Sequence, residues 1–156
     1  MKLIKILTIT FITLLFFVPD LKAQDADKIL GYWLTQDGDS QVKIFKAKKG
    51  KYYGDIRWLE EPYEDDGTPK KDTENSDSEL QKRTILGLQI LKGFPYDSKD
   101  NEWVDGTIYD PKNGKTYKCY MWFEDGNDKI LHVKGFIGFS MLGREVEWVR
   151  EEKLKD

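Results

Sequence analysis

Hydrophobic and polar residues alternate over most of the chain that follows residue 28. Alternation with a period of two is typical of a half-buried β-strand, because successive side chains of a strand point to opposite faces. The stretches that we predict as strands are 31–35, 41–44, 52–58, 84–94, 103–109, 116–123, 131–137 and 144–150.

Short turn sequences connect most of these predicted strands. Gln36-Asp37-Gly38-Asp39 and Asp110-Pro111-Lys112-Asn113-Gly114 are two examples, and the Asn-Gly pair tolerates the positive φ of a tight turn. No long helical period interrupts the strands, so a parallel α/β sheet is not expected. We predict an all-β fold, an antiparallel up-and-down barrel of about eight strands. A barrel is favoured over a sandwich because closure removes unpaired strand edges.

The polar segment 60–79 breaks the alternation. Glu60-Glu61-Pro62 and the stretch 64–69 have the composition of a loop. We predict one short helical turn in the 60–82 excursion, starting near Ser76 or Asp77. Because the segment is long for a hairpin connection, it is either a lid over a site or a solvated excursion.

The first 23 residues have the pattern of a secretory signal peptide. Lys2 and Lys5 precede an apolar run over 6–18, and Ala23 is small enough to precede a cleavage site. The run is shorter than the ~20 apolar residues of a membrane span; an uncleaved anchor is the alternative. We therefore expect residues 24–156 to form a single domain without a membrane span, in an extracytoplasmic location, periplasmic or secreted.

Composition narrows the chemistry. The chain has one cysteine, one histidine and a net charge of -3. A single cysteine excludes an internal disulfide framework and a cysteine-based zinc site, and a single histidine leaves no histidine pair for a metal. The acidic balance argues against nucleic acid as a partner. We predict no metal and no cofactor, with Cys119 buried and inert and His132 at the surface or rim.

Five aromatic residues are predicted to point into the barrel. They fill its core, or they line a pocket for a small, partly apolar or aromatic ligand. Glycines at 54, 87, 106 and 135 would make room for close strand packing or for the ligand. The tentative ligand-binding residues are Tyr52, Trp58, Tyr117, Phe123 and Trp148.

Four blocks of sequence, in order, resemble an uncharacterised bacterial family known as domain of unknown function 2147 (DUF2147). This resemblance implies an exported bacterial protein, and it transfers no catalytic residue. The blocks are Trp33-Leu34-Thr35, residues 87–94, residues 106–117, and Gly135-Phe136-Ile137-Gly138 followed by Leu142-Gly143-Arg144.

A looser resemblance concerns the two ends of the predicted barrel. Gly31-Tyr32-Trp33, together with Arg150 in the last strand, is similar to the Gly-x-Trp and arginine pairing of lipocalins and other calycins. It implies that Gly31, Trp33 and Arg150 close the barrel, with the guanidinium over the indole ring. Arg144 is the competing candidate for that role.

Three functions remain after these arguments, and we favour the first. It is the binding of a small, partly apolar ligand by a monomer or weak homodimer. The second is a protein-interaction or envelope-maintenance module, which exposed aromatics such as Tyr53, Tyr109, Tyr120 or Trp122 would favour if they formed one patch. The third and least favoured is a hydrolase with paired carboxylates, for which the candidates are Asp105, Asp110, Glu145 and Glu147.

Overall fold

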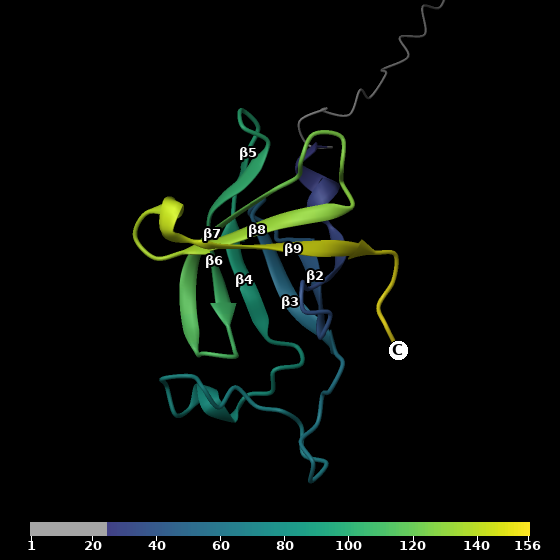
Figure 1. The fold of residues 1–156 in the computed structure, drawn as a ribbon, viewed down its shortest axis with the longest axis vertical. Helices are drawn as coiled ribbons and strands as arrows, with labels where there is room; N and C mark the ends of the chain where they lie inside the picture. The colour runs from purple at the N-terminus through teal and green to yellow at the C-terminus, as the bar shows by residue number, and fades with distance from the viewer. Residues whose placement is uncertain (1–24) are drawn as a thin grey trace, which may run out of the picture.

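The computed structural model describes residues 25–156, and its strands follow one another around a closed antiparallel barrel (Figure 1). Three single 3-10 turns accompany the strands: η1 (Asp27–Ile29), η2 (Leu80–Lys82) and η3 (Ser140–Leu142). The strands are β1 (Gly31–Leu34), β2 (Ser40–Lys46), β3 (Tyr52–Leu59), β4 (Gln89–Phe94), β5 (Tyr96–Asp97), β6 (Glu102–Asp110), β7 (Lys115–Trp122), β8 (Ile130–Phe136) and β9 (Arg144–Glu151).

Each strand of the barrel pairs with its neighbours in the sequence, which is the up-and-down arrangement. The order is β4-β3-β2-β1-β9-β8-β7-β6-β5, and a further pairing of β4 with β6 completes the circle. β5 is a two-residue extension that pairs only with β6, so eight strands form the wall. The predicted all-β barrel of about eight strands is confirmed, as is a single short turn of helix in the excursion, η2.

One end of the barrel is closed by η1 and a cluster of aromatic side chains. The indole nitrogens of Trp33 and Trp103 donate to the carbonyl oxygens of Ile29 (2.9 Å) and Ala26 (3.1 Å). Both indoles are fully buried, and Phe123 lies between them, with ring centres 5.8 and 5.4 Å away. The segment before β1 therefore acts as a plug, held by hydrogen bonds that satisfy both buried N–H groups.

A β-bulge in β3 changes the face to which Trp58 points. Val42 pairs with Ile56, but the preceding residue Gln41 pairs with Trp58, so Arg57 is an extra residue on β3. Ile56 is buried inside the barrel, whereas Trp58 lies outside and donates from Nε1 to the carbonyl of Asp156 (3.1 Å). The prediction that Trp58 points inward is wrong, because the extra residue shifts the alternation by one position.

The long connection between β3 and β4 lies at the open end of the barrel (Figure 1). Its anchor is the fully buried carboxylate of Asp72, which accepts hydrogen bonds from Tyr109 (2.5 Å) and Asn75 (3.0 Å). Arg83 adds two more, 2.9 Å from Nε and 2.7 Å from the terminal nitrogen. The excursion is thus fastened to β6 by a satisfied polar network, which a buried charge requires.

The signal-peptide prediction concerns residues outside those that the structure describes. Over residues 25–156, no helix is long and apolar enough to cross a membrane. The domain boundary after residue 23 therefore stays a prediction.

Candidate functional site

A cavity of about 410 Å³ opens at the end of the barrel opposite η1. Its inner wall is apolar and comes from five different strands, with buried side chains such as Ile56 and Ile90 facing Val133 and Trp148. Cavities of 300–1,000 Å³ with apolar walls and a few polar groups are the usual form of a small-molecule site. The apolar wall consists of Ile56, Ile90, Ile108, Val133, Val146 and Trp148.

The rim of this cavity is polar. Lys112, in the β6–β7 turn, reaches across to the β1–β2 turn and pairs with Asp37 (2.9 Å) and Asp39 (2.7 Å). Burial raises the pKa of Asp39, but the hydrogen bonds from Lys112, Thr35 and Ser40 outweigh it, so this pKa lies below its ordinary value. The pKa of Lys112 is raised, chiefly by its hydrogen bond to Asp39. The ion pair between Lys112 and Asp39 therefore links the β6–β7 turn to the β1–β2 turn across the mouth.

Arg144 is a second cation at the rim. It begins β9, is exposed, and lines the cavity beside Phe136 and Val146. Among the described residues, its guanidinium has no ion-pair or hydrogen-bond partner, in contrast to Lys112. Arg144 is therefore the rim cation that is free to meet an acidic group of a ligand.

Two of the five predicted ligand-binding residues line the cavity. Trp148 is buried in its wall, and Tyr117 is half-buried near the mouth, where its hydroxyl accepts a hydrogen bond from Asn113 (3.0 Å). Tyr52 and Phe123 belong instead to the aromatic cluster of the closed end, and Trp58 lies outside. The sequence pattern therefore grouped residues into one predicted site, whereas the structure places them at opposite ends of the barrel or outside it.

Several cavity residues were not singled out from the sequence. Ile90, Ile108 and Val146 are aliphatic, and nothing in an apolar residue on an inward face distinguishes a cavity wall from packed core. The glycines distinguish packed core from cavity wall more clearly. Added Cβ atoms at Gly54 and Gly106 would lie 2.8 Å from Leu91 and 2.4 Å from Phe94, so these glycines serve close packing, as the sequence allowed.

A second cavity of about 400 Å³ lies next to the first, beneath the excursion. Ser40, Ile56 and Lys112 line both cavities, while Lys70 and Ile85 of the excursion line only the second. The excursion therefore covers the side of the mouth rather than the mouth itself.

The closed end contains the residues predicted to close the barrel. Arg150 lies opposite Trp33 in the pairing of β9 with β1, and its guanidinium is 4.2 Å from the centre of the indole ring. It donates to the carbonyl oxygens of Leu30 (3.1 Å), Asp128 (2.8 Å) and Lys28. Gly31 has a φ of 129° and faces this guanidinium. Arg150, and not Arg144, occupies the position over Trp33.

Two of the four carboxylates considered for catalysis, those of Asp110 and Glu145, are held in other roles. The carboxylate of Asp110 accepts from the backbone N–H of Lys112 (2.9 Å) and from the side chain of Asn113 (2.8 Å), which is a turn contact. Glu145 lies 3.3 Å from His132 on the outer face. Over residues 25–156, no group of three or more histidine, cysteine or acidic residues is arranged to hold a metal ion.

Cys119 is buried in the barrel wall, and burial raises the pKa of its thiol. His132 is almost fully covered, since its ring stacks on Trp122 with centres 5.0 Å apart. Both lie away from the cavity lining, so the one thiol and the one imidazole take no part in the candidate site.

A closed eight-stranded up-and-down barrel, with an apolar cavity at one end and an arginine over a tryptophan at the other, defines a lipocalin-like fold. The chain belongs to the family described as "Uncharacterized protein conserved in bacteria (DUF2147)", whose model matches residues 31–150. A solved structure with a similar fold is protein HP1028 of Helicobacter pylori, described as belonging to the lipocalin family. The two chains share 23% identity over 80% of this chain and 83% of that one, with a TM-score of 0.64. A search of curated proteins found no match.

Proposed function

We propose that the protein binds a small, partly apolar ligand in the open end of its barrel. The observation that carries this proposal is the cavity itself, about 410 Å³ with an aliphatic wall and a charged rim. A barrel filled by its own side chains would leave no such space, because protein interiors pack as densely as organic crystals. The cavity volume falls in the range of known ligand sites.

The rim narrows the chemistry of the ligand. The aliphatic wall favours a hydrocarbon or aromatic body, which is driven in by removal of apolar surface from water. Asp37 and Asp39 are neutralised by Lys112, whereas Arg144 has no partner among the described residues. An amphiphile with an acidic group at one end would place its body against Val146 and its head near Arg144.

The test uses 8-anilinonaphthalene-1-sulfonate, a fluorescent aromatic sulfonate, as the probe. We expect saturable binding to the wild type, and a loss of about tenfold or more in affinity for Val146→Trp, whose indole would occupy the cavity. Val149→Trp is the matched control, since Val149 lies on the same strand, is exposed on the outer face and does not line the cavity. Equal probe affinity in both variants would show that the cavity is not the binding site. Competition by decanoate, haem or aromatic acids then ranks ligand classes.

A second candidate function rests on the outer surface of β7 and β8. Trp122 stacks on Tyr120 (5.2 Å between ring centres) and on His132 (5.0 Å), and Tyr120 contacts Phe136. Tyr120, Trp122 and Phe136 are half-buried rather than fully exposed, and their rings form one row, which is the observation in favour of a protein-interaction module. Tyr109 is not part of it, because Tyr109 is buried against Asp72. Pull-down from envelope extract with wild type and with Tyr120→Ser/Trp122→Ser distinguishes a specific partner from background.

The mouth does not favour the hydrolase hypothesis. A general acid needs a raised pKa, whereas the pKa of Asp39 is lowered. Asp37 and Asp39 both bind Lys112 and do not face each other across an open cleft as an acid and a base.

Export remains part of the proposed function. The positively charged start, the apolar run over 6–18 and Ala23 support a cleaved signal and an extracytoplasmic location. Expression of the full chain in a bacterial host, followed by cell fractionation and intact mass, tests it. We expect the protein in the periplasm or medium with Gln24 as its first residue, and a full-length chain retained in the cytoplasm would contradict it.

A further inference from the structure

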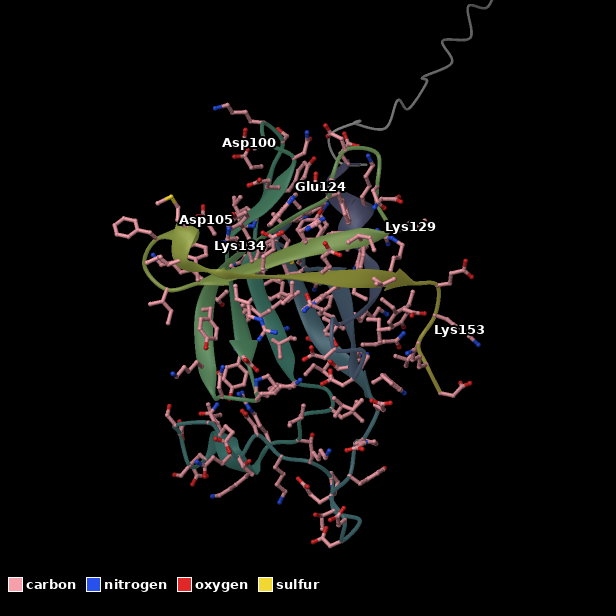
Figure 2. The ribbon with its side chains drawn as sticks, in the orientation of Figure 1. Asp100, Asp105, Glu124, Lys129, Lys134 and Lys153 are labelled. Carbon is pink, nitrogen blue, oxygen red and sulfur yellow. The ribbon has the colours of Figure 1, made fainter. Side chains whose placement is uncertain are left out.

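The connection between β8 and β9 carries the most exposed large apolar side chains of residues 25–156. Phe139 is 79% exposed and Met141 is 89% exposed, and they are flanked by Ile137 (69%) and Leu142 (82%). In Figure 2, side chains of this connection project outward at the left of the view. Ile137 and Leu142 also line the cavity, so the exposed apolar loop forms part of its mouth.

This apolar loop, residues 137–143, is a formed turn with a fixed base. The backbone N–H of Leu142 donates to the carbonyl of Phe139 (3.1 Å), and η3 shapes the tip. At the base, a Cβ added to Gly143 would lie 2.6 Å from the carbonyl oxygen of Gly135, so the chain passes tightly against β8 there. The fold therefore presents four apolar side chains to the outside and covers none of them, although exposed apolar clusters mark interaction sites.

The apolar loop is uncharged, and two cations lie at its base. Residues 136–143 contain no charged side chain, in a chain that is 34% charged. Two exposed cations stand at the base: Arg144 follows the loop directly, and Lys118 pairs with Phe136 in the neighbouring strand. The nearest carboxylate in the sequence, Glu145, contacts His132 on the outer face. An apolar tip above a cationic base matches a surface of hydrocarbon beneath anionic headgroups.

We propose that the apolar loop docks the protein on a lipid bilayer. Phe139 and Met141 enter the boundary between headgroups and acyl chains, and Arg144 and Lys118 lie at the level of the phosphates. A protein partner is less suited to this loop, because a stable complex buries about 800 Å² on each side over 20–30 residues. Arg144 takes part in both proposals, whereas Phe139 and Met141 do not line the cavity, and docking turns the cavity mouth towards the lipid.

Vesicle co-sedimentation tests this proposal. The purified chain from residue 24 onward is mixed with vesicles of phosphatidylcholine, or of phosphatidylethanolamine with phosphatidylglycerol. We expect wild-type protein to sediment with both, and more strongly with the anionic vesicles. Phe139→Ser/Met141→Ser should weaken partitioning about tenfold or more, because each large apolar side chain buried changes an equilibrium by roughly that factor. The matched control Leu80→Ser/Leu86→Ser, two exposed apolar residues of the excursion, should partition like wild type.

Two further variants separate the electrostatic contribution to vesicle binding from any contribution of the cavity. Arg144→Gln should weaken binding to the anionic vesicles more than to phosphatidylcholine. Val146→Trp, which fills the cavity, should leave vesicle binding unchanged, so failure of ligand binding and failure of docking are distinguishable. Wild-type protein that stays in the supernatant with both vesicles would overturn the proposal. So would an equal loss in the Leu80/Leu86 variant, or a dimer in light scattering that Phe139→Ser/Met141→Ser dissolves while vesicle binding is unaffected.

Discussion

The guanidinium of Arg150 lies 4.2 Å from the centre of the Trp33 indole ring, where the last strand of the barrel pairs with the first. The same guanidinium donates to the carbonyl oxygens of Leu30, Lys28 and Asp128. One side chain thus joins β9, η1 and the β7–β8 turn. Stacking on the indole and hydrogen bonding to backbone carbonyls act together, and we expect both to stabilise the closed end of the barrel.

Replacement of this arginine is therefore the first prediction. Arg150→Ala should lower the free energy of unfolding by about 2–3 kcal/mol, because it removes the cation–π contact and leaves the partly buried carbonyl group of Leu30 without a donor. Chemical denaturation measures the change. Arg57→Ala is the control, since Arg57 is exposed on β3, and it should cost less than about 0.5 kcal/mol. Equal stability of Arg150→Ala and wild type would contradict the closing role.

The buried carboxylate of Asp72 gives a second prediction. Asp72→Ala should lower the free energy of unfolding by about 1–3 kcal/mol, because Tyr109 and Asn75 lose their buried acceptor. Arg83 remains about one-third exposed and can be hydrated, which limits the cost. Limited proteolysis should cut the excursion faster in this variant. Asp66→Ala, in an exposed turn of the same excursion, serves as the control, and faster cutting in both variants would argue against an anchor at Asp72.

Acid sensitivity follows from Asp27. Burial raises its pKa, but hydrogen bonds from Lys46 (2.8 Å) and Tyr52 (2.5 Å) outweigh burial, so the pKa lies below the ordinary value of 3.8. The unfolded chain then binds a proton more readily than the native chain, and the ionised carboxylate stabilises the fold above pH 3.8. This contribution is lost as the pH falls through the lower, native pKa.

Asp27→Asn tests this dependence. At pH 7 the variant should be less stable than wild type by about 1 kcal/mol, a modest value because the side chain is partly exposed. The difference should shrink as the pH falls from 3.8 through the lower, native pKa of Asp27, where the wild-type carboxyl group is also protonated. Denaturant unfolding at several pH values measures it, and a difference that stays constant down to pH 2 would exclude linkage to this carboxyl group.

Cys119 should be unreactive in the native protein. Its side chain is buried in the barrel wall, and burial raises the pKa of the thiol, so little thiolate is exposed to a reagent. Reaction with a disulfide reagent should be slower than in denaturant by about 100-fold or more, because it requires opening of the barrel. Rapid native labelling would place the thiol at the surface instead.

The barrel was predictable because its local signals agree with one another. Alternation in β7, from Thr116 to Trp122, and the Asn113-Gly114 turn before it define strand and connection without any long-range information. Gly31, Trp33 and Arg150 then indicated which strands meet. The bulge at Arg57 was not visible, since one extra residue in a strand leaves no mark in composition, and it moved Trp58 to the outer face.

The cavity could be predicted only in part. Inward alternation identified Tyr117 and Trp148, but it also selected Tyr52 and Phe123, which pack at the other end of the barrel. Depth along the barrel axis depends on strand register, and period-two alternation reports only the face. The exposed loop was also missed: the predicted strand 131–137 includes Ile137, but β8 ends at Phe136 and Ile137 is exposed.

The strand order has a consequence for how the barrel assembles. Most wall strands pair with the strands that precede and follow them in the sequence, so most pairings close short loops. The contact between Arg150 and Leu30, in contrast, joins residues 120 positions apart. Closing a long loop costs more chain entropy than closing a short one. Pairing β1 with β9 therefore carries a larger loop-closure cost than pairing strands that follow one another, and the contact of Arg150 with Trp33 helps to offset it. A linker that joined the two ends of the domain would make the pairing of β1 with β9 local and would lower this entropic cost.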